Sequence, residues 1–179
     1  MDYDVIIVGA GPAGLFAAYE LAEKSKLKIL IIEKGKDIED RKCPMLKTGK
    51  CLKCPTCNIM YGVGGAGGLS DGTLNLRPDI GGNLAELVND ENYAWQLVYE
   101  VDKIFLRFGA PREVYKGDEE EVKKLEKKAA QVGIKFIPII QRHIGSDNTP
   151  RVIKNIKQHL ENDILSALKG GVSLGEQRV

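Results

Sequence analysis

Three glycines near the start of the chain have a spacing that suits phosphate binding. Gly9, Gly11 and Gly14 form the pattern G-x-G-x-x-G in the stretch VGAGPAG, and Pro12 and Ala13 complete the loop. In such a loop the first glycine permits a tight turn and the second lets a pyrophosphate approach the backbone. The third lets the following helix pack close to the preceding strand. The triplet alone is a weak signal, so its neighbours decide its meaning.

The residues on either side of this loop supply the context that the pattern requires. Residues 3–8, YDVIIV, are continuously apolar and β-branched after the first two positions, which predicts a buried parallel strand. LFAAYELAEKSK predicts a helix, and residues 27–33, LKILIIE, predict a second buried strand. That strand ends at Glu33, where a carboxylate can bind the ribose of an adenosine and disfavours the 2′-phosphate of NADP. The unit predicts dinucleotide binding. The alternative is a glycine turn that only joins a strand to a helix.

A second glycine-rich segment follows at residues 62–72. Its six glycines allow a backbone to fold closely around a flat or phosphorylated ligand and to offer N–H donors to it. The alternative is a flexible linker. Ser70 and Asp71 precede the last glycine and an apolar stretch, which favours an anchored turn over a tether.

All four cysteines lie between these two loops. Cys43, Cys51, Cys54 and Cys57 occur in the stretch CPMLKTGKCLKCPTC. Thiolates two residues apart can converge on one ion, and four of them satisfy zinc or an iron–sulfur cluster. A redox-active pair, most naturally Cys51 and Cys54, is a second interpretation, and reduced thiols in a structural loop are a third. The spacing leaves all three open.

Composition excludes several partners. The chain has 179 residues, 26 basic and 25 acidic, for a net charge of +1, so nothing favours nucleic acid or an anionic membrane as a partner. Its N-terminus lacks a basic leader region, and no apolar run is long enough to span a membrane. We therefore expect a cytoplasmic protein, in which clustered thiols are metal ligands or redox groups more often than disulfides.

The rest of the chain predicts mainly helices. Helices are expected at residues 91–108, 118–133 and 149–168, and a strand at residues 134–140 that Pro138 makes irregular. His143 follows that strand and is expected to be a surface or hydrogen-bonded structural residue, and His159 to be solvated on a polar helix face. No residue stands out as a catalytic acid or base.

Several stretches resemble known flavoproteins. DVIIVGAGPAGLFAAYELA and IIEKG resemble the FAD-binding N-terminus of the large flavoproteins with two dinucleotide-binding domains. EKGKDIEDRKCP, the cysteine run and GVGGAGGLSDGTLNL resemble a family of FAD-dependent dehydrogenases whose glycine-rich loop ends in Ser-Asp-Gly. The likeness covers roughly residues 3–80, with weaker support in QRHIGSDNTPRVIKNI.

The resemblance implies a fold, a cofactor and an activity. It implies a Rossmann-like α/β domain with a parallel sheet and FAD bound to it, in an oxidoreductase whose flavin accepts hydride or electrons from a small molecule, NAD(P) or an electron-transfer partner. It also assigns residues to the cofactor. Glu33, Lys34 and Arg41 would lie along the adenosine and pyrophosphate, and Gly64, Gly65, Ala66, Gly67, Ser70 and Asp71 would approach the rest of the flavin.

The resemblance also implies three regions and an incomplete flavin site. Residues 1–80 would form the FAD-binding unit, 81–140 a mainly helical insertion or the start of a substrate domain, and 141–179 a return segment. The resembled flavoproteins are longer, and a later strand brings a Gly-Asp motif to the flavin that this sequence lacks. We therefore expect half of a flavin site. The alternatives are a non-catalytic nucleotide-binding module and an NAD-binding domain without its catalytic half.

Overall fold

The computed structural model describes residues 3–168 and 174–176. The chain divides into two compact units, one made of Met1–Gly72 with Gly145–Val179 and the other of Thr73–Ile144. The second unit encloses the insertion that the sequence predicts at residues 81–140.

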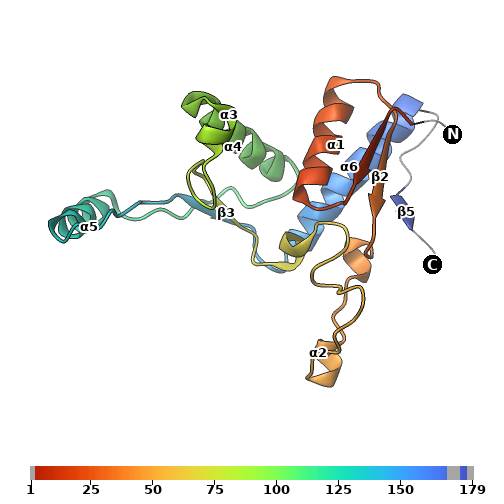
Figure 1. Ribbon diagram of the computed structural model, residues 1–179, viewed down its shortest axis with the longest axis horizontal. Coiled ribbons are helices and arrows are strands. Elements are labelled where there is room, and N and C mark those ends of the chain that lie inside the picture. Colours follow the sequence, from red (N-terminus) through yellow and green to blue (C-terminus); the bar gives the residue numbers. More distant parts are fainter. Residues whose placement is uncertain (1–2, 169–173, 177–179) are drawn as a thin grey trace. The chain divides into compact units, whose positions relative to one another are not determined.

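The first unit contains a parallel sheet (Figure 1). Strand β1 (Val5–Val8) leads through helix α1 (Pro12–Lys24) to strand β2 (Ile29–Glu33), which pairs with β1 in parallel. Strand β5 (Leu174–Glu176) pairs with the other edge of β2, also in parallel. The structure confirms the predicted α/β fold with its βαβ start.

The two faces of this sheet differ in burial. Val5 pairs with Ile29 and Ile7 with Ile31, so these side chains share the face that lies against α1, and Ile29 and Ile31 are buried. On the opposite face Ile6 is 58% exposed and Val8 is 83% exposed. The prediction that β1 is buried on both faces is therefore wrong. A strand that is covered on only one face can have the same uniformly apolar sequence. Residue types alone then do not show which alternate set of side chains is buried.

Helix α6 (Thr149–Leu168) completes the core of the first unit. It confirms the helix predicted over the same residues and lies beside α1 (Figure 1). Its buried residues Val152, Ile156 and Leu160 recur every four positions, so they form one stripe along the helix. On α1, Leu15 and Ala18 are buried as well.

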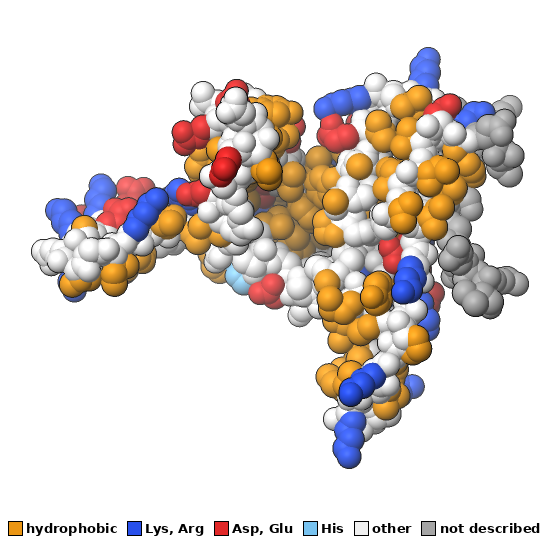
Figure 2. Space-filling view, in the orientation of Figure 1, with side chains coloured by type: hydrophobic (Ala, Val, Ile, Leu, Met, Phe, Trp, Pro, Cys, Tyr) orange, Lys and Arg blue, Asp and Glu red, His pale blue; other side chains and the backbone are white. Residues whose placement is uncertain are grey.

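The connection from β2 to the second unit has little regular structure. It contains the 3₁₀ helix η1 (Ile38–Asp40), the single-turn helix α2 (Met45–Thr48) and the 3₁₀ helix η2 (Ala66–Leu69). The cysteine run occupies the part around α2. Figure 2 shows basic and apolar side chains gathered on this loop, where Leu46 is 83% exposed.

The second unit combines a two-stranded sheet with helices. Strand β3 (Thr73–Asn75) pairs antiparallel with β4 (Gln141–His143), and the helices are α3 (Leu84–Val88), α4 (Glu91–Arg107) and α5 (Glu119–Gln131). Asp90 and Asp118 cap α4 and α5 by accepting backbone N–H groups. The strand predicted at 134–140 is wrong. The chain joins the sheet only at β4, which follows Pro138. Proline has no backbone N–H to donate to the hydrogen bonds of a sheet.

A buried ion pair joins β4 to α4. Arg142 is 4% exposed, and its Nε and Nη2 donate to the two carboxylate oxygens of Asp102 at 2.6 and 2.8 Å. Nη1 donates to the Pro111 carbonyl at 2.6 Å.

Within the described residues, no helix has the length and apolar character that crossing a membrane requires.

Candidate dinucleotide-binding site

The first glycine loop presents the amino end of α1 without a cap. Gly11 occupies the N-cap position, no side chain caps the helix, and its first turn has no acidic residue. The first N–H groups of a helix have no partner within it and carry a partial positive charge. Pro12 and Ala13 at this end are exposed. The end of α1 is therefore available to an anionic group such as a phosphate.

Gly14 sets how closely α1 lies on the sheet. A Cβ atom at this position would lie 2.0 Å from the Gly9 carbonyl oxygen and 3.3 Å from Cγ2 of Ile7. No side chain fits into that space, so this position requires glycine. The structure thus gives Gly14 the packing role that the motif predicts.

The second glycine segment lies against the first. Gly64 N–H donates to the Ala10 carbonyl at 2.8 Å, and a Cβ on Gly65 would lie 3.1 Å from the Gly11 Cα. On its other side, a Cβ on Gly64 would lie 3.0 Å from Cγ2 of Ile153 in α6. The segment is therefore docked between α1 and α6, and the flexible-linker alternative does not describe it.

Glu33 ties the two glycine segments together. One carboxylate oxygen accepts from the Ala10 N–H at 2.7 Å, and the other accepts from Gly35 N–H at 2.8 Å and Gly62 N–H at 2.9 Å. Burial raises the pKa of this carboxyl group. The three N–H donors and nearby Arg41 together lower it by more than burial raises it, so the pKa lies below its ordinary value. An ionised carboxylate has about four acceptor positions, so about one is left for a ribose hydroxyl.

Arg41 anchors the base of the cysteine loop. It is 4% exposed, and its three guanidinium nitrogens donate to the carbonyls of Asn58 at 2.9 Å, Val63 at 2.8 Å and Ile59 at 2.7 Å. Asn58 in turn donates to the Lys42 carbonyl at 2.7 Å. Arg41 thus holds the glycine segment in place, and its predicted contact with a pyrophosphate stays a prediction.

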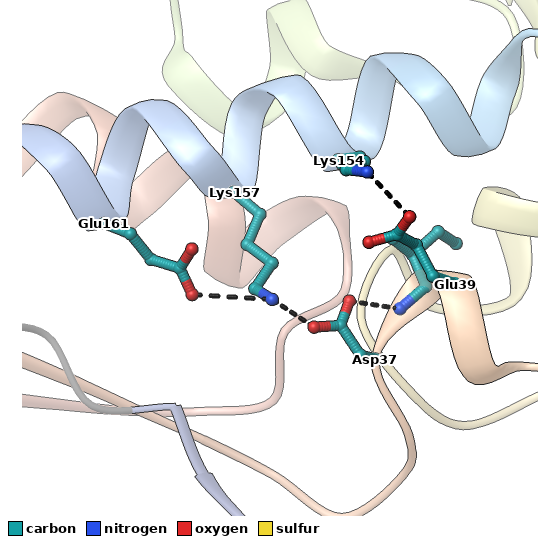
Figure 3. Close-up of polar contacts among 6 residues, drawn as sticks. Asp37, Glu39, Lys154, Lys157 and Glu161 are labelled. Carbon is teal, nitrogen blue, oxygen red and sulfur yellow. Dashed lines mark hydrogen bonds and ion pairs between the residues drawn. The ribbon is translucent and has the colours of Figure 1, made fainter.

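Ion pairs fasten the start of this connection to α6 (Figure 3). Lys157 contacts Asp37 and also Glu161, the latter at 3.4 Å, and Lys154 contacts Glu39 at 2.7 Å. Asp37 additionally accepts the Ile38 N–H, which begins η1. The chain between β2 and the second glycine segment is therefore held at η1 and at Arg41.

The remaining predicted cofactor residues have local partners. The Lys34 ammonium lies 4.8 Å from the centre of the Tyr61 ring. Ser70 donates through Oγ to the Gly67 carbonyl at 2.8 Å, and the Asp71 carbonyl accepts the Gly145 N–H at 2.9 Å. Ala66 and Gly67 are exposed in η2, beside the docked Gly64 and Gly65. The structure therefore places three predicted parts of the site together, namely the glycine segment 9–14, Glu33 and the glycine segment 64–67.

The cysteines do not form a ligand cluster. Cys43, Cys51, Cys54 and Cys57 are free thiols, and Cys51 is exposed. Across residues 3–168 and 174–176, no three His, Cys, Asp or Glu side chains converge where they could hold a metal ion. The arrangement therefore does not fit the predicted zinc or iron–sulfur site, because spacing along a loop does not by itself bring sulfur atoms together.

The two histidines have partners within their own units. His143 is exposed, lies 3.3 Å from Thr73 Oγ1 and meets the edge of the Tyr115 ring. His159 lies 2.9 Å from a carboxylate oxygen of Glu23, with its side chain 18% exposed. The prediction that His159 is solvated is wrong, because α6 packs that face against α1.

Sequence reasoning missed three contributors. Ala10 is fully buried and uses both its N–H and its carbonyl to join Glu33 and Gly64. Gly62 has φ +114°, and a Cβ there would lie 2.5 Å from the Lys36 carbonyl oxygen, so it requires glycine as well. Ile153 backs Gly64 from α6. Ala10 could have been found inside the G-x-G triplet, but Ile153 carries no signal beyond its apolar character.

Comparison with known proteins gives matches to the N-terminal part of the chain. The model of the Thi4 family matches residues 1–38. A dihydrolipoyl dehydrogenase of Mycoplasma genitalium is 71% identical over 34 residues, which cover 19% of this chain and 7% of that protein. A digeranylgeranylglycerophospholipid reductase of Methanosarcina mazei is 48% identical over 52 residues, or 28% of this chain and 12% of that protein. The chain is thus related to oxidoreductases over a short N-terminal stretch.

A longer match reaches both units. An uncharacterized protein of Clostridium beijerinckii is 31% identical over 157 residues, which cover 87% of this chain. The chain spans 22% of the length of that relative. No solved structure matches the chain. Together with the β1–α1–β2 geometry, these matches identify a dinucleotide-binding start.

Proposed function

We propose that the first unit binds FAD and serves as the flavin-binding part of an FAD-dependent oxidoreductase. The observation that carries the proposal is the convergence of two glycine segments at the uncapped end of α1, with Glu33 bonded to both. A single glycine loop is common to many dinucleotide sites. A second one docked beside it offers additional backbone to a longer ligand. The N-terminal likeness to a dehydrogenase and a reductase supports the same assignment.

Each part of this site would bind a different part of the dinucleotide. The N–H groups at the start of α1 would hold the pyrophosphate, and Gly11 would let it approach the backbone. The remaining acceptor position of Glu33 would bind a ribose hydroxyl. The exposed residues of η2 would lie along the flavin side. Bound flavin would accept hydride or an electron pair from the donor, and the chain's own residues would position and orient it.

Gly11 permits a test that separates binding from folding. A Cβ on Gly11 would approach nothing closer than the Gly65 Cα, at 3.9 Å, so alanine fits the unliganded fold. The same Cβ would stand where the pyrophosphate must approach. We therefore expect Gly11→Ala to keep the thermal midpoint of the wild type and to lose at least ten-fold in FAD affinity, corresponding to about 1.4 kcal/mol.

The measurement is titration of the purified chain with FAD, NAD⁺ and NADP⁺, followed by flavin fluorescence and calorimetry. We expect FAD to bind most tightly, with a visible flavin band in the protein after gel filtration. Gly82→Ala, which introduces a Cβ in open space within the second unit, is the matched control. Tighter binding of NAD⁺ than of FAD would replace the proposal with an NAD-binding domain. Binding of neither would contradict both.

A further inference from the structure

The second unit contains a cavity of about 420 Å³, within the size range of small-molecule sites. Its wall comes from α4, α5 and the chain segments beside β3 and β4. Most of the wall is apolar, and its aliphatic and aromatic side chains are Leu76, Trp95, Val122, Pro138, Ile139 and Ile140. An apolar cavity with a few polar groups at its edge is the usual form of a site for an organic ligand.

One arginine at this cavity is held in a fixed position. The Nε and Nη2 atoms of Arg77 each donate to a carboxylate oxygen of Asp79 at 2.8 Å. The guanidinium carbon lies 5.7 Å from the centre of the Trp95 ring. The third nitrogen, Nη1, lies 3.5 Å from the Pro138 carbonyl oxygen, beyond the usual range of a hydrogen bond. Nη1 therefore has donor capacity for a ligand that enters beside Trp95 and Pro138.

The charges around the cavity compensate one another. Asp79 neutralises Arg77 through the bidentate contact. Glu119 and Lys123 lie four residues apart on α5, the favourable order for a surface pair, and Lys116 and Glu126 add one charge of each sign. A charged ligand would lose hydration here and meet charges of both signs, since Lys116 and Lys123 are balanced by Glu119 and Glu126, so the cavity favours neither an anion nor a cation. The site offers hydrogen-bond donors without a net charge.

We propose that this cavity binds an uncharged, mainly apolar molecule that presents a carbonyl oxygen, as a ketone or an ester does. The apolar body would lie against Trp95 and the aliphatic walls, and the carbonyl oxygen would accept from Nη1 of Arg77. Burial of the body supplies most of the binding free energy, and the arginine orients the ligand. This proposal does not depend on whether the first unit binds FAD.

The protein carries its own reporter for this cavity. Trp95 is the only tryptophan in the chain, so its indole N–H gives a single cross-peak in a ¹H–¹⁵N correlation spectrum. The full chain is titrated with 2-octanone, octanoate and octylammonium, which share an alkyl body and differ in the polar end. We expect 2-octanone to shift the indole peak saturably and to bind at least five-fold more tightly than either ion.

Two substitutions on α5 show whether the shift comes from the cavity. Val122 lines it, so Val122→Phe fills the space and should abolish the response to 2-octanone. Leu125 lies one turn further along, is 48% exposed and does not line the cavity, so Leu125→Phe is the matched control and should bind normally. Arg77→Met should weaken 2-octanone binding at least three-fold and should not weaken octylammonium binding, since it removes a positive charge and leaves Asp79 without its partner.

Three results would overturn the proposal. The first is the absence of a saturable indole shift with 2-octanone in the folded wild type. The second is equal affinity for 2-octanone and the two ions, which would show that the polar end is not recognised. The third is unchanged binding in a folded Val122→Phe protein, which would place the ligand elsewhere.

Discussion

Replacing Gly14 by alanine tests how closely α1 lies on β1. The added Cβ would lie 2.0 Å from the Gly9 carbonyl oxygen and 3.1 Å from the Gly9 carbonyl carbon. Relief of that overlap requires α1 to move away from the strand by roughly 1 Å, which loosens the packing of Leu15 and Ala18. Overpacking of this kind costs about 1–3 kcal/mol. Alanine returns at most about 1 kcal/mol through its higher helix propensity. Because an approach of 2.0 Å is a severe overlap, the cost should lie at about 2–3 kcal/mol, which leaves a net loss of about 1–2 kcal/mol.

Urea denaturation followed by far-UV circular dichroism measures this loss. With a urea dependence of about 2 kcal/mol per molar for a small protein, the midpoint should fall by about 0.5–1 M. Gly82→Ala, which meets no atom within 4 Å, should change the free energy of unfolding by less than about 0.5 kcal/mol. An unchanged or higher midpoint for Gly14→Ala would refute the inferred close approach.

Three further substitutions test the ionic contacts. Asp102→Ala leaves the buried Arg142 guanidinium without a counter-charge and should cost about 3–5 kcal/mol, part of which the double variant with Arg142→Met should restore in urea denaturation. Because the pKa of Glu33 is lowered in the fold, its contribution to stability is complete above the ordinary value of 4.5 and is lost as the pH falls through the lower folded-state pKa. Thermal melting between about pH 3 and 7 should show a steeper decline in the wild type than in Glu33→Gln, since the other carboxylates titrate in both proteins. Asp37→Asn removes the pair with Lys157 and should lower the melting temperature in dilute buffer, and less at about 1 M salt, where such pairs are screened.

The sequence predicts the glycine loop well because each of its requirements is local. Gly9 has φ +102° and Gly14 makes a packing contact a few residues later, whereas the approach path at Gly11 stays a prediction. Glu33 is predicted at the correct end of β2 as well. Its three N–H donors come from three separate segments, and no local pattern contains them. The sequence therefore indicates where the carboxylate lies and not what holds it.

Partners distant in the sequence decide the surroundings of Arg41, which the sequence does not show, and explain two predictions that failed. Arg41 stands next to the cysteine run, but the carbonyls that it binds belong to the far end of the loop. The apolar segment 134–140 has the composition of a strand, and only residues 141–143 find a partner, in β3. His159 looks solvated on its own helix until α1 is placed beside it. In each case tertiary pairing decides the environment.

The uneven burial of the sheet also bears on how β1 tolerates change. Although the sequence of β1 is uniformly apolar, the effect of a substitution on stability should alternate from one residue to the next. Polar residues at Ile6 and Val8 replace side chains that already face water, whereas the same changes at Val5 and Ile7 enter the layer under α1. The strand can therefore tolerate sequence variation at Ile6 and Val8, while Val5 and Ile7 keep the contacts on which the glycine loop depends.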